Sequence, residues 1–344
     1  MKSEKVPTKT ITQNDVAKEA GVTRSMVSYV INGNSDRSVA PATKRRILDA
    51  IEKLGYRPNK AAQALQQGDV EFASNRIGVV LCNAQVFSRP YYADILSGIH
   101  TAAHENNYHV TFIRFFEELK DPVLFNELIH PEEVGGLILV SLDQCLAQEE
   151  DRKIIDRIKE RVPNVVCVEW QYDGLCSIGF DRLLTAQKAC DYLFTKGITD
   201  IAYIGEVDDR ISGVERSFSN HGKNPLELKT ESAYTVPSGY SAAKKFLEEN
   251  KLPQGFVCGS DEVAFGVMCW LNENKIDIPG QVAVISIDNI EMSGYTNPPL
   301  TTMNVQKVSM GTRAVEMIVQ NKGKAEIEAI DITLPTSIVE RKSV

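Results

Sequence analysis

Cysteine is scarce in this 344-residue sequence, and long apolar runs are missing. The seven cysteines form no Cys-x-x-Cys pair, so neither a disulfide framework nor a zinc site of ordinary spacing is expected. The longest apolar stretches, such as residues 135–140, fall far short of the roughly 18 residues that a membrane span needs. No apolar core follows the lysines of the amino terminus, as a secretory signal would require. The sequence therefore predicts a cytoplasmic protein with reduced thiols and no membrane contact.

The motifs of common enzyme classes are missing as well. There is no G-x-x-x-x-G-K-S/T phosphate loop, no G-x-G-x-x-G fingerprint after a strand, no G-x-S-x-G elbow and no H-E-x-x-H pair. The five histidines are scattered, and the pair His100 and His104 is more readily explained as a surface coincidence than as a metal site. The sequence gives no reason to expect a catalytic residue, a metal or a cofactor.

The composition is that of an ordinary globular protein, but the charge is divided unevenly. Hydrophobic residues make up 43% and charged residues 24% of the chain, which is long enough for two or three domains. Residues 1–70 carry twelve Lys and Arg against seven Asp and Glu, a net charge of +5, whereas the remainder carries 26 against 39, a net charge of −13. A basic segment on an acidic body fits a nucleic-acid contact at the amino terminus. A chance excess of lysines on a solvated face is the alternative.

Three short helices are expected in the basic segment. Residues 12–20 begin with Thr12 and Asp15 at capping-box spacing and end at Gly21. A second helix is expected over residues 23–31, and a third over residues 41–54, opened by a proline and stopped by Gly55. Together these segments predict a small helical bundle.

The first two of these helices, joined by a glycine turn, have the organisation of a helix-turn-helix. In that motif the second helix enters the major groove with its first residues against base edges. Arg24 can make two hydrogen bonds to guanine, and Ser25 can donate or accept one. The short polar residues suited to phosphate contacts are Thr12, Thr23, Ser28 and Asn32. A helical hairpin that merely packs is the alternative.

From residue 76 onward, apolar runs of strand length alternate with amphipathic helical segments, which indicates βαβ units and parallel sheets. The expected strands are residues 77–82, 110–114, 137–140, 165–169, 177–180, 201–204, 256–258 and 282–287. A break near residues 173–174 divides them into two similar halves. We therefore expect an α/β body of two doubly wound parallel-sheet lobes enclosing a cleft at the carboxyl ends of their strands. Residues 59–67 are expected to form a short hinge helix that is marginal by itself.

Three motifs, D-V-A-x-x-A-G-V at residues 15–22, L-G-Y-R-P-N at 54–59 and P-P-L-T-T at 298–302, resemble those of the LacI/GalR family of bacterial transcription regulators. The resemblance extends from about residue 12 to residue 341. It implies an all-α helix-turn-helix head in residues 1–58, a hinge helix and linker in 59–75, and a periplasmic-binding-protein-like body in 76–344. Its N-lobe would comprise about residues 76–174 and 303–325, and its C-lobe about 175–302 and 326–344.

The same resemblance implies further DNA contacts. Asn59 belongs to the family's exit from the head, and Ala62 and Leu65 fall where paired hinge helices enter the minor groove. Leu65 is then expected to wedge into the central base step and kink the duplex, although a packing contact between head and body is the alternative. Tyr29 stands where the family most often has arginine, so the operator half-site cannot be copied from a relative.

The family's effector site maps onto residues of the body. Asp181, Arg210 and Asp288 follow expected strands, and two carboxylates with one guanidinium suit a polyhydroxylated ligand. An interlobe salt-bridge set is the alternative for these three. Aromatic and polar residues expected at the cleft are Tyr91, Tyr92, Trp170, Tyr234 and Ser260, the last standing where many relatives have asparagine. Core packing is the alternative for each aromatic residue.

The resemblance implies a repressor that binds a near-palindromic DNA operator as a homodimer, under the control of a small-molecule effector in the cleft. A sugar or sugar derivative is the expected effector, and a nucleobase is the less common one. No leucine heptad follows Arg341, so a dimer rather than a tetramer is expected. The rival classes are a sugar- or nucleobase-binding protein and an enzyme that uses the same cleft.

Overall fold

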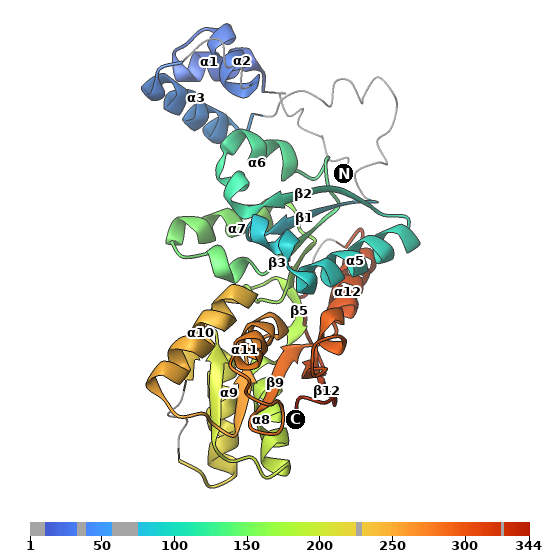
Figure 1. Cartoon of the computed structure of the whole chain (residues 1–344). Helices are drawn as coiled ribbons and strands as arrows, with labels where there is room; N and C mark the ends of the chain where they lie inside the picture. Colours follow the sequence, from blue (N-terminus) through green and yellow to red (C-terminus); the bar gives the residue numbers. More distant parts are fainter. Residues whose placement is uncertain (1–10, 33–38, 57–74, 225–228, 325–326) are drawn as a thin grey trace. The chain divides into compact units, whose positions relative to one another are not determined.

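The amino-terminal helices form a small bundle in the computed structural model, which describes residues 11–32, 39–56, 75–224, 229–324 and 327–344. The helices are α1 (Gln13–Ala20), α2 (Arg24–Asn32) and α3 (Pro41–Leu54), each within one residue of its predicted bounds (Figure 1). The capping box is present, because the Thr12 hydroxyl accepts from the backbone N–H of Asp15 and the Asp15 carboxylate accepts from that of Thr12. The predicted hinge helix lies outside the described residues.

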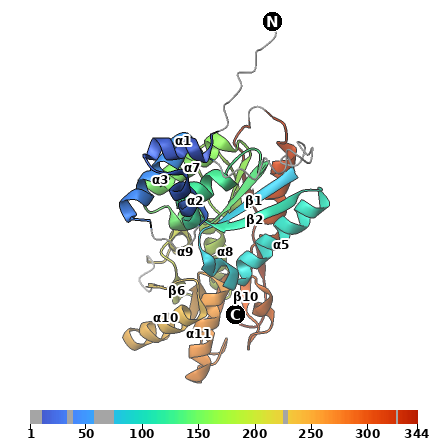
Figure 2. The same ribbon diagram turned by 90° about the horizontal axis from the view of Figure 1, so that it is seen from above.

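Glycines and apolar side chains fix this bundle, which we call the head. Gly21 and Gly55 end α1 and α3 with φ angles of 63° and 61°, a left-handed conformation that glycine adopts without strain. Val16, Val27 and Ile47 are fully buried at the centre. Figure 2 shows the ribbons of the three helices grouped together. The head therefore has a hydrophobic core of its own.

The body contains two six-stranded sheets. The first, sheet A, has the strand order β11-β5-β4-β3-β1-β2. Its strands are β1 (Arg76–Leu81), β2 (His109–Phe115), β3 (Gly136–Val140), β4 (Val165–Val168), β5 (Cys176–Phe180) and β11 (Asp331–Leu334). The pairs β1–β2, β1–β3 and β3–β4 are parallel. Gly78 on β1 leaves room for the Phe112 ring, because a Cβ there would lie 2.2 Å from that ring.

The second sheet, sheet B, has the order β12-β10-β9-β8-β6-β7. Its strands are β6 (Ile201–Gly205), β7 (Lys229–Glu231), β8 (Gly255–Cys258), β9 (Ala283–Asp288), β10 (Thr301–Asn304) and β12 (Ser337–Val339). All described pairs are parallel except β10–β12. The predicted strands of both sheets are present within one residue of their expected ends, whereas β7, β10, β11 and β12 were not predicted.

Helices flank the strands, as βαβ units require. They are α5 (Pro90–Glu105), α6 (Pro122–Leu128), α7 (Glu149–Arg161), α8 (Arg182–Thr195), α9 (Asp209–Asn220), α10 (Val236–Glu249), α11 (Asp261–Glu273) and α12 (Lys307–Gln320), with short 3-10 turns η3 (Ala84–Ser88), η4 (Phe116–Lys120), η5 (Leu142–Cys145) and η6 (Glu291–Gly294). Helices α10 and α11 approach closely through Gly239 and Gly266, where a Cβ would lie 2.2 Å and 2.1 Å from backbone oxygens of the facing helix. Among the described residues, no helix is long and apolar enough to cross a membrane.

The chain divides into two compact units. The first comprises Met1–Ser88, Leu96–Ser177 and Gly311–Asp331, and the second comprises Arg89–Ile95, Ile178–Met310 and Ile332–Val344. The start of α5 and the start of α12 thus belong to the second unit, together with sheet B. The second unit therefore combines residues from distant parts of the sequence with the carboxyl ends of β6, β8 and β9.

Candidate DNA-binding head and effector site

The exposed start of α2 carries the residues predicted to read DNA. Arg24 and Ser25 are both exposed, and the Thr23 hydroxyl accepts a hydrogen bond from the N–H of Met26 at 3.4 Å. The Nε of Arg24 donates to the Gln13 side chain on α1, also at 3.4 Å. This long contact on the surface is weak and can be exchanged for a base edge when DNA binds.

The other predicted DNA contacts are placed differently. Thr12 is occupied by the capping box, and Ser28 and Tyr29 are half-buried on α2. Asn32 is the last residue of α2, but its side chain is not described. Asn59, Ala62 and Leu65 lie outside the described residues, so their roles stay predictions.

Arg210 is the centre of a buried polar cluster in the second unit. It lies in the first turn of α9 and is 5% exposed. Its guanidinium forms an ion pair with Asp208 and donates to the Tyr234 hydroxyl at 2.7 Å. That hydroxyl in turn donates to Asp208 at 3.0 Å. Burial alone would lower the pKa of Arg210, but Tyr234 and Asp208 together raise it, so the guanidinium stays charged.

A second cation joins the cluster from the start of α5. The Nε of Arg89 donates to Glu262 at 2.9 Å, and its guanidinium lies 5.0 Å from the centre of the Tyr234 ring and 5.1 Å from that of Tyr92. Stacking of this kind orients both partners. Arg89 and Arg210 therefore flank the same tyrosine.

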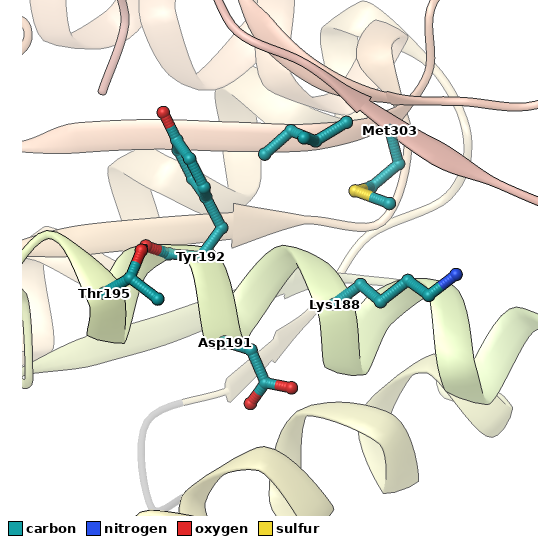
Figure 3. A pocket seen from close by; sticks show the side chains of 6 residues that line it. Lys188, Asp191, Tyr192, Thr195 and Met303 are labelled. Atoms are coloured by element: carbon teal, nitrogen blue, oxygen red, sulfur yellow. The ribbon is translucent and has the colours of Figure 1, made fainter.

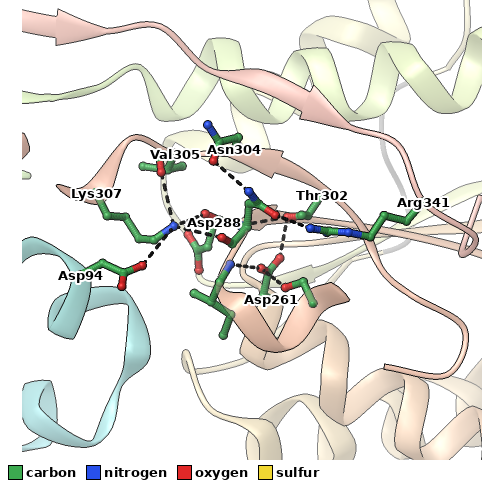
Figure 4. Close-up of polar contacts among 11 residues, drawn as sticks. Asp94, Asp261, Asp288, Thr302, Asn304, Val305, Lys307 and Arg341 are labelled. Carbon is green, nitrogen blue, oxygen red and sulfur yellow. Dashed lines mark hydrogen bonds and ion pairs between the residues drawn. The ribbon is translucent and has the colours of Figure 1, made fainter. Parts of the chain in front are cut away.

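Asp288 ends β9 and is almost completely buried. Its φ angle is 125° and that of the next residue, Asn289, is 54°, a backbone that costs energy for residues with a side chain and is often found at ligand sites. Lys307 holds this turn, because its ammonium donates to the carbonyl oxygens of Asp288 at 2.5 Å and Asn289 at 3.2 Å. The same ammonium lies 3.7 Å from a carboxylate oxygen of Asp94 (Figure 4).

Asp261 stabilises the segment around this turn through hydrogen bonds. One of its carboxylate oxygens accepts from the hydroxyls of Ser286 at 2.5 Å and Thr302 at 2.6 Å. The other accepts from the N–H of Ile290 at 2.8 Å and from the Ser293 hydroxyl. Burial raises the pKa of Asp261 in spite of these bonds. Burial, followed by the neighbouring Asp261, also raises the pKa of Asp288 well above its ordinary value, although Arg210 and Lys307 oppose the shift.

The remaining predicted effector residues are dispersed. Asp181 is exposed and caps α8, its carboxylate accepting from the N–H of Leu184 at 2.8 Å. Ser260 is buried and caps α11. Trp170 is buried in the first unit, where its indole donates to the carbonyl of Leu139 at 2.8 Å. Tyr91 and Tyr92 are buried near the start of α5. Among the predicted effector residues that the structure describes, Arg210 donates a hydrogen bond to Tyr234, and the rings of Tyr91 and Tyr92 are in edge contact with their centroids 5.3 Å apart.

Comparison with known proteins decides the family. Residues 12–59 match the model described as bacterial regulatory proteins, lacI family, and residues 190–344 match the periplasmic binding protein-like domain. The chain is 30% identical over 339 residues to the HTH-type transcriptional regulator RegA of Clostridium saccharobutylicum, covering 96% of this chain and 98% of the relative. The chain belongs to the LacI family. As a LacI-family protein it is a DNA-binding transcription regulator, and its relatives are regulators rather than enzymes.

Other LacI-family relatives cover the chain to a similar extent. The HTH-type transcriptional repressor PurR of Aliivibrio fischeri is 29% identical, covering 97% of this chain and 98% of the relative. Among solved structures, a CelR–cellobiose complex has a TM-score of 0.69 at 23% identity, covering 97% of this chain and 100% of that one. The lac repressor dimer bound to operator and the anti-inducer ONPF also has a TM-score of 0.69, at 24% identity, covering 97% and 99%. The predicted fold class is thereby confirmed.

Three residues of the candidate site were missed by the sequence analysis. Arg89, Asp208 and Lys307 were not predicted, because each makes a contact with a residue at least 19 positions away that only the fold brings close. Asp208 could have been recognised as the cap of α9, since it precedes a helix with a second aspartate. Position in the sequence alone would not have shown that it pairs with Arg210.

A separate pocket of about 260 Å³ lies on α8. Figure 3 shows its lining, in which Lys188, Asp191, Tyr192 and Thr195 lie along α8 and Met303 lies on β10. None of the predicted effector residues lines it. The pocket is therefore distinct from the Arg210 cluster.

Proposed function

We propose that the chain is a repressor that binds a near-palindromic operator as a homodimer. The exposed Arg24 and Ser25 at the start of α2 support major-groove recognition. Two heads related by twofold symmetry would match two half-sites, which favours a dimer. Named repressors among the relatives, including PurR and the ribose operon repressor of Escherichia coli, support repression.

We further propose that a sugar or sugar derivative binds at the carboxyl end of sheet B and controls operator affinity. The observation that carries this proposal is the Nε of Arg210, which is buried and has no hydrogen-bond partner within the described part of the chain. An unsatisfied buried donor costs about 1–3 kcal/mol, and a ligand oxygen would satisfy it.

The neighbouring groups suit hydroxyl recognition. Asp208 and Asp288 offer carboxyl groups and Arg89 offers a cation, all of which can form hydrogen bonds with sugar hydroxyls. Solved relatives in complex with cellobiose and with ribose are consistent with this class of ligand. The ligand changes DNA affinity only to the extent that it binds the DNA-bound and free states unequally.

The test is a fluorescence-anisotropy titration of the full chain with DNA fragments from its own promoter region, repeated with sugars, sugar phosphates and purines. We expect salt-sensitive binding with a dissociation constant of about 10⁻⁸ to 10⁻¹¹ M, shifted at least fivefold by a sugar or sugar derivative. No specific binding would contradict the repressor. A shift by a purine alone would contradict the sugar.

Arg210→Ala is expected to abolish the effector response while operator affinity without effector stays within about twofold. The variant removes the ligand's anchor but leaves the head intact. Urea unfolding of Arg210→Ala and of Arg210→Lys is measured alongside. A full response in the folded Arg210→Ala protein would show that Arg210 does not contact the effector.

A further inference from the structure

Met26 is an unusual residue for the surface it occupies. Its side chain is 41% exposed in the first turn of α2. Among the head residues that the structure describes, 11–32 and 39–56, it is the one exposed large apolar side chain. The adjacent Val27 is fully buried. Packing in the core of the head therefore does not explain why an apolar side chain stands at position 26.

The position of Met26 on the helix places it beside the residues that read DNA. Residues three apart on a helix are neighbours, so Met26 lies next to Tyr29 on the side of α2 that turns away from Val27. Ser25 precedes it and is exposed as well. The first turn of this helix is the part that reaches base edges in helix-turn-helix proteins. Met26 is thus part of the surface presented to the major groove.

We propose that Met26 is a specificity-determining residue that reads the 5-methyl group of a thymine in each operator half-site. The proposal rests on the DNA-binding function of the head. A methionine side chain offers no hydrogen-bond donor and only a weak acceptor, so it has little to offer a phosphate. The thymine methyl is the apolar group that an unmodified base pair presents in the major groove.

This contact would also explain why an apolar side chain is exposed in the free protein. Met26 would lose contact with water only when DNA binds, and burial of both its methyl end and the thymine methyl would then favour the complex. Methionine is flexible and polarisable, so it can follow the irregular edge of a base step. The other exposed side chains at the start of the helix are polar and recognise bases by hydrogen bonds. Met26 would instead distinguish thymine from the other bases by its methyl group.

The test removes one methyl group at a time. An operator is selected from a random-sequence DNA pool with the wild-type full chain, and each thymine is then replaced by deoxyuridine. We expect one symmetric pair of positions at which the replacement weakens wild-type binding by about fourfold per half-site, the value for one buried methyl group. The Met26→Ala variant should bind both DNAs equally at that position.

The four combinations of protein and DNA form a double-mutant cycle. Arg24→Ala is the matched control, since it should bind more weakly yet keep the full penalty for deoxyuridine. Insensitivity of the wild type to deoxyuridine at every position, or an unchanged penalty in Met26→Ala, would overturn the proposal for Met26. Failure of the wild type to select any operator would instead overturn the repressor function itself.

Discussion

The Asp261→Ala substitution should strongly lower the free energy of unfolding of the second unit. The carboxylate accepts four hydrogen bonds, three from hydroxyls and one from the N–H of Ile290. Each bond to a charged group contributes about 1.5–3 kcal/mol, while burial of the carboxylate costs several kcal/mol. We therefore expect the free energy of unfolding to fall by about 3–5 kcal/mol. Asp261→Asn keeps one acceptor oxygen and should lose about half as much.

The assay uses the two tryptophans, which lie in different units. In a Trp170→Phe background, Trp270 on α11 is the remaining fluorophore, so its emission in a urea titration follows the second unit. Asp209→Asn is the control, because Asp209 is exposed in the same unit and should change stability by less than about 0.5 kcal/mol. A loss below about 1 kcal/mol in Asp261→Ala would refute the reasoning, since the hydrogen bonds would then only balance the cost of burial.

Two further variants test the head and the strained turn. Arg24→Ala should weaken specific operator binding by about 1–3 kcal/mol and leave binding to random DNA nearly unchanged, and equal losses on both DNAs would show that Arg24 contacts only phosphates. For Asp288, the raised pKa means that the folded state holds the proton more strongly than the unfolded chain, so the contribution of this group to stability falls as pH rises above its ordinary pKa of 3.8. Asp288→Asn removes the titration and tolerates a positive φ. The urea midpoint of Asp288→Asn, relative to that of the wild type, should rise between pH 4 and pH 8. A fall over this range would contradict the raised pKa of Asp288.

Most of the strands that the sequence predicts have apolar and buried side chains, although β2 was predicted and none of its positions is fully buried. The central strands β3 and β4 are buried at every position, so their apolar runs are unmistakable. Strand β10 begins with Thr301 and Thr302, which are also fully buried. The hydroxyl of Thr302 is satisfied by its hydrogen bond to Asp261. Because that partner lies in another segment of the chain, the local sequence pattern does not predict a strand here.

The site could be predicted only in part for the same reason. Arg210 and Asp288 were found through the family resemblance, which assigns positions but not partners. The partners of Arg210 come from the loop before α9 and from Tyr234, whereas the turn at Asp288 is fixed by Lys307. These contacts depend on the register of sheet B and on where α12 begins.

The route of the chain through its two sheets has a consequence for biosynthesis. Sheet A is completed by β11, and sheet B by β12 and by Ser343, which accepts from the N–H of Thr301 and donates to the carbonyl of Val284. A ribosome adds about 5–20 residues per second, so neither sheet can be completed before residues 331–343 have been made. The core of the head, by contrast, closes between residues 16 and 56. The nascent chain would therefore carry a folded head for many seconds before the two sheets of the body are complete.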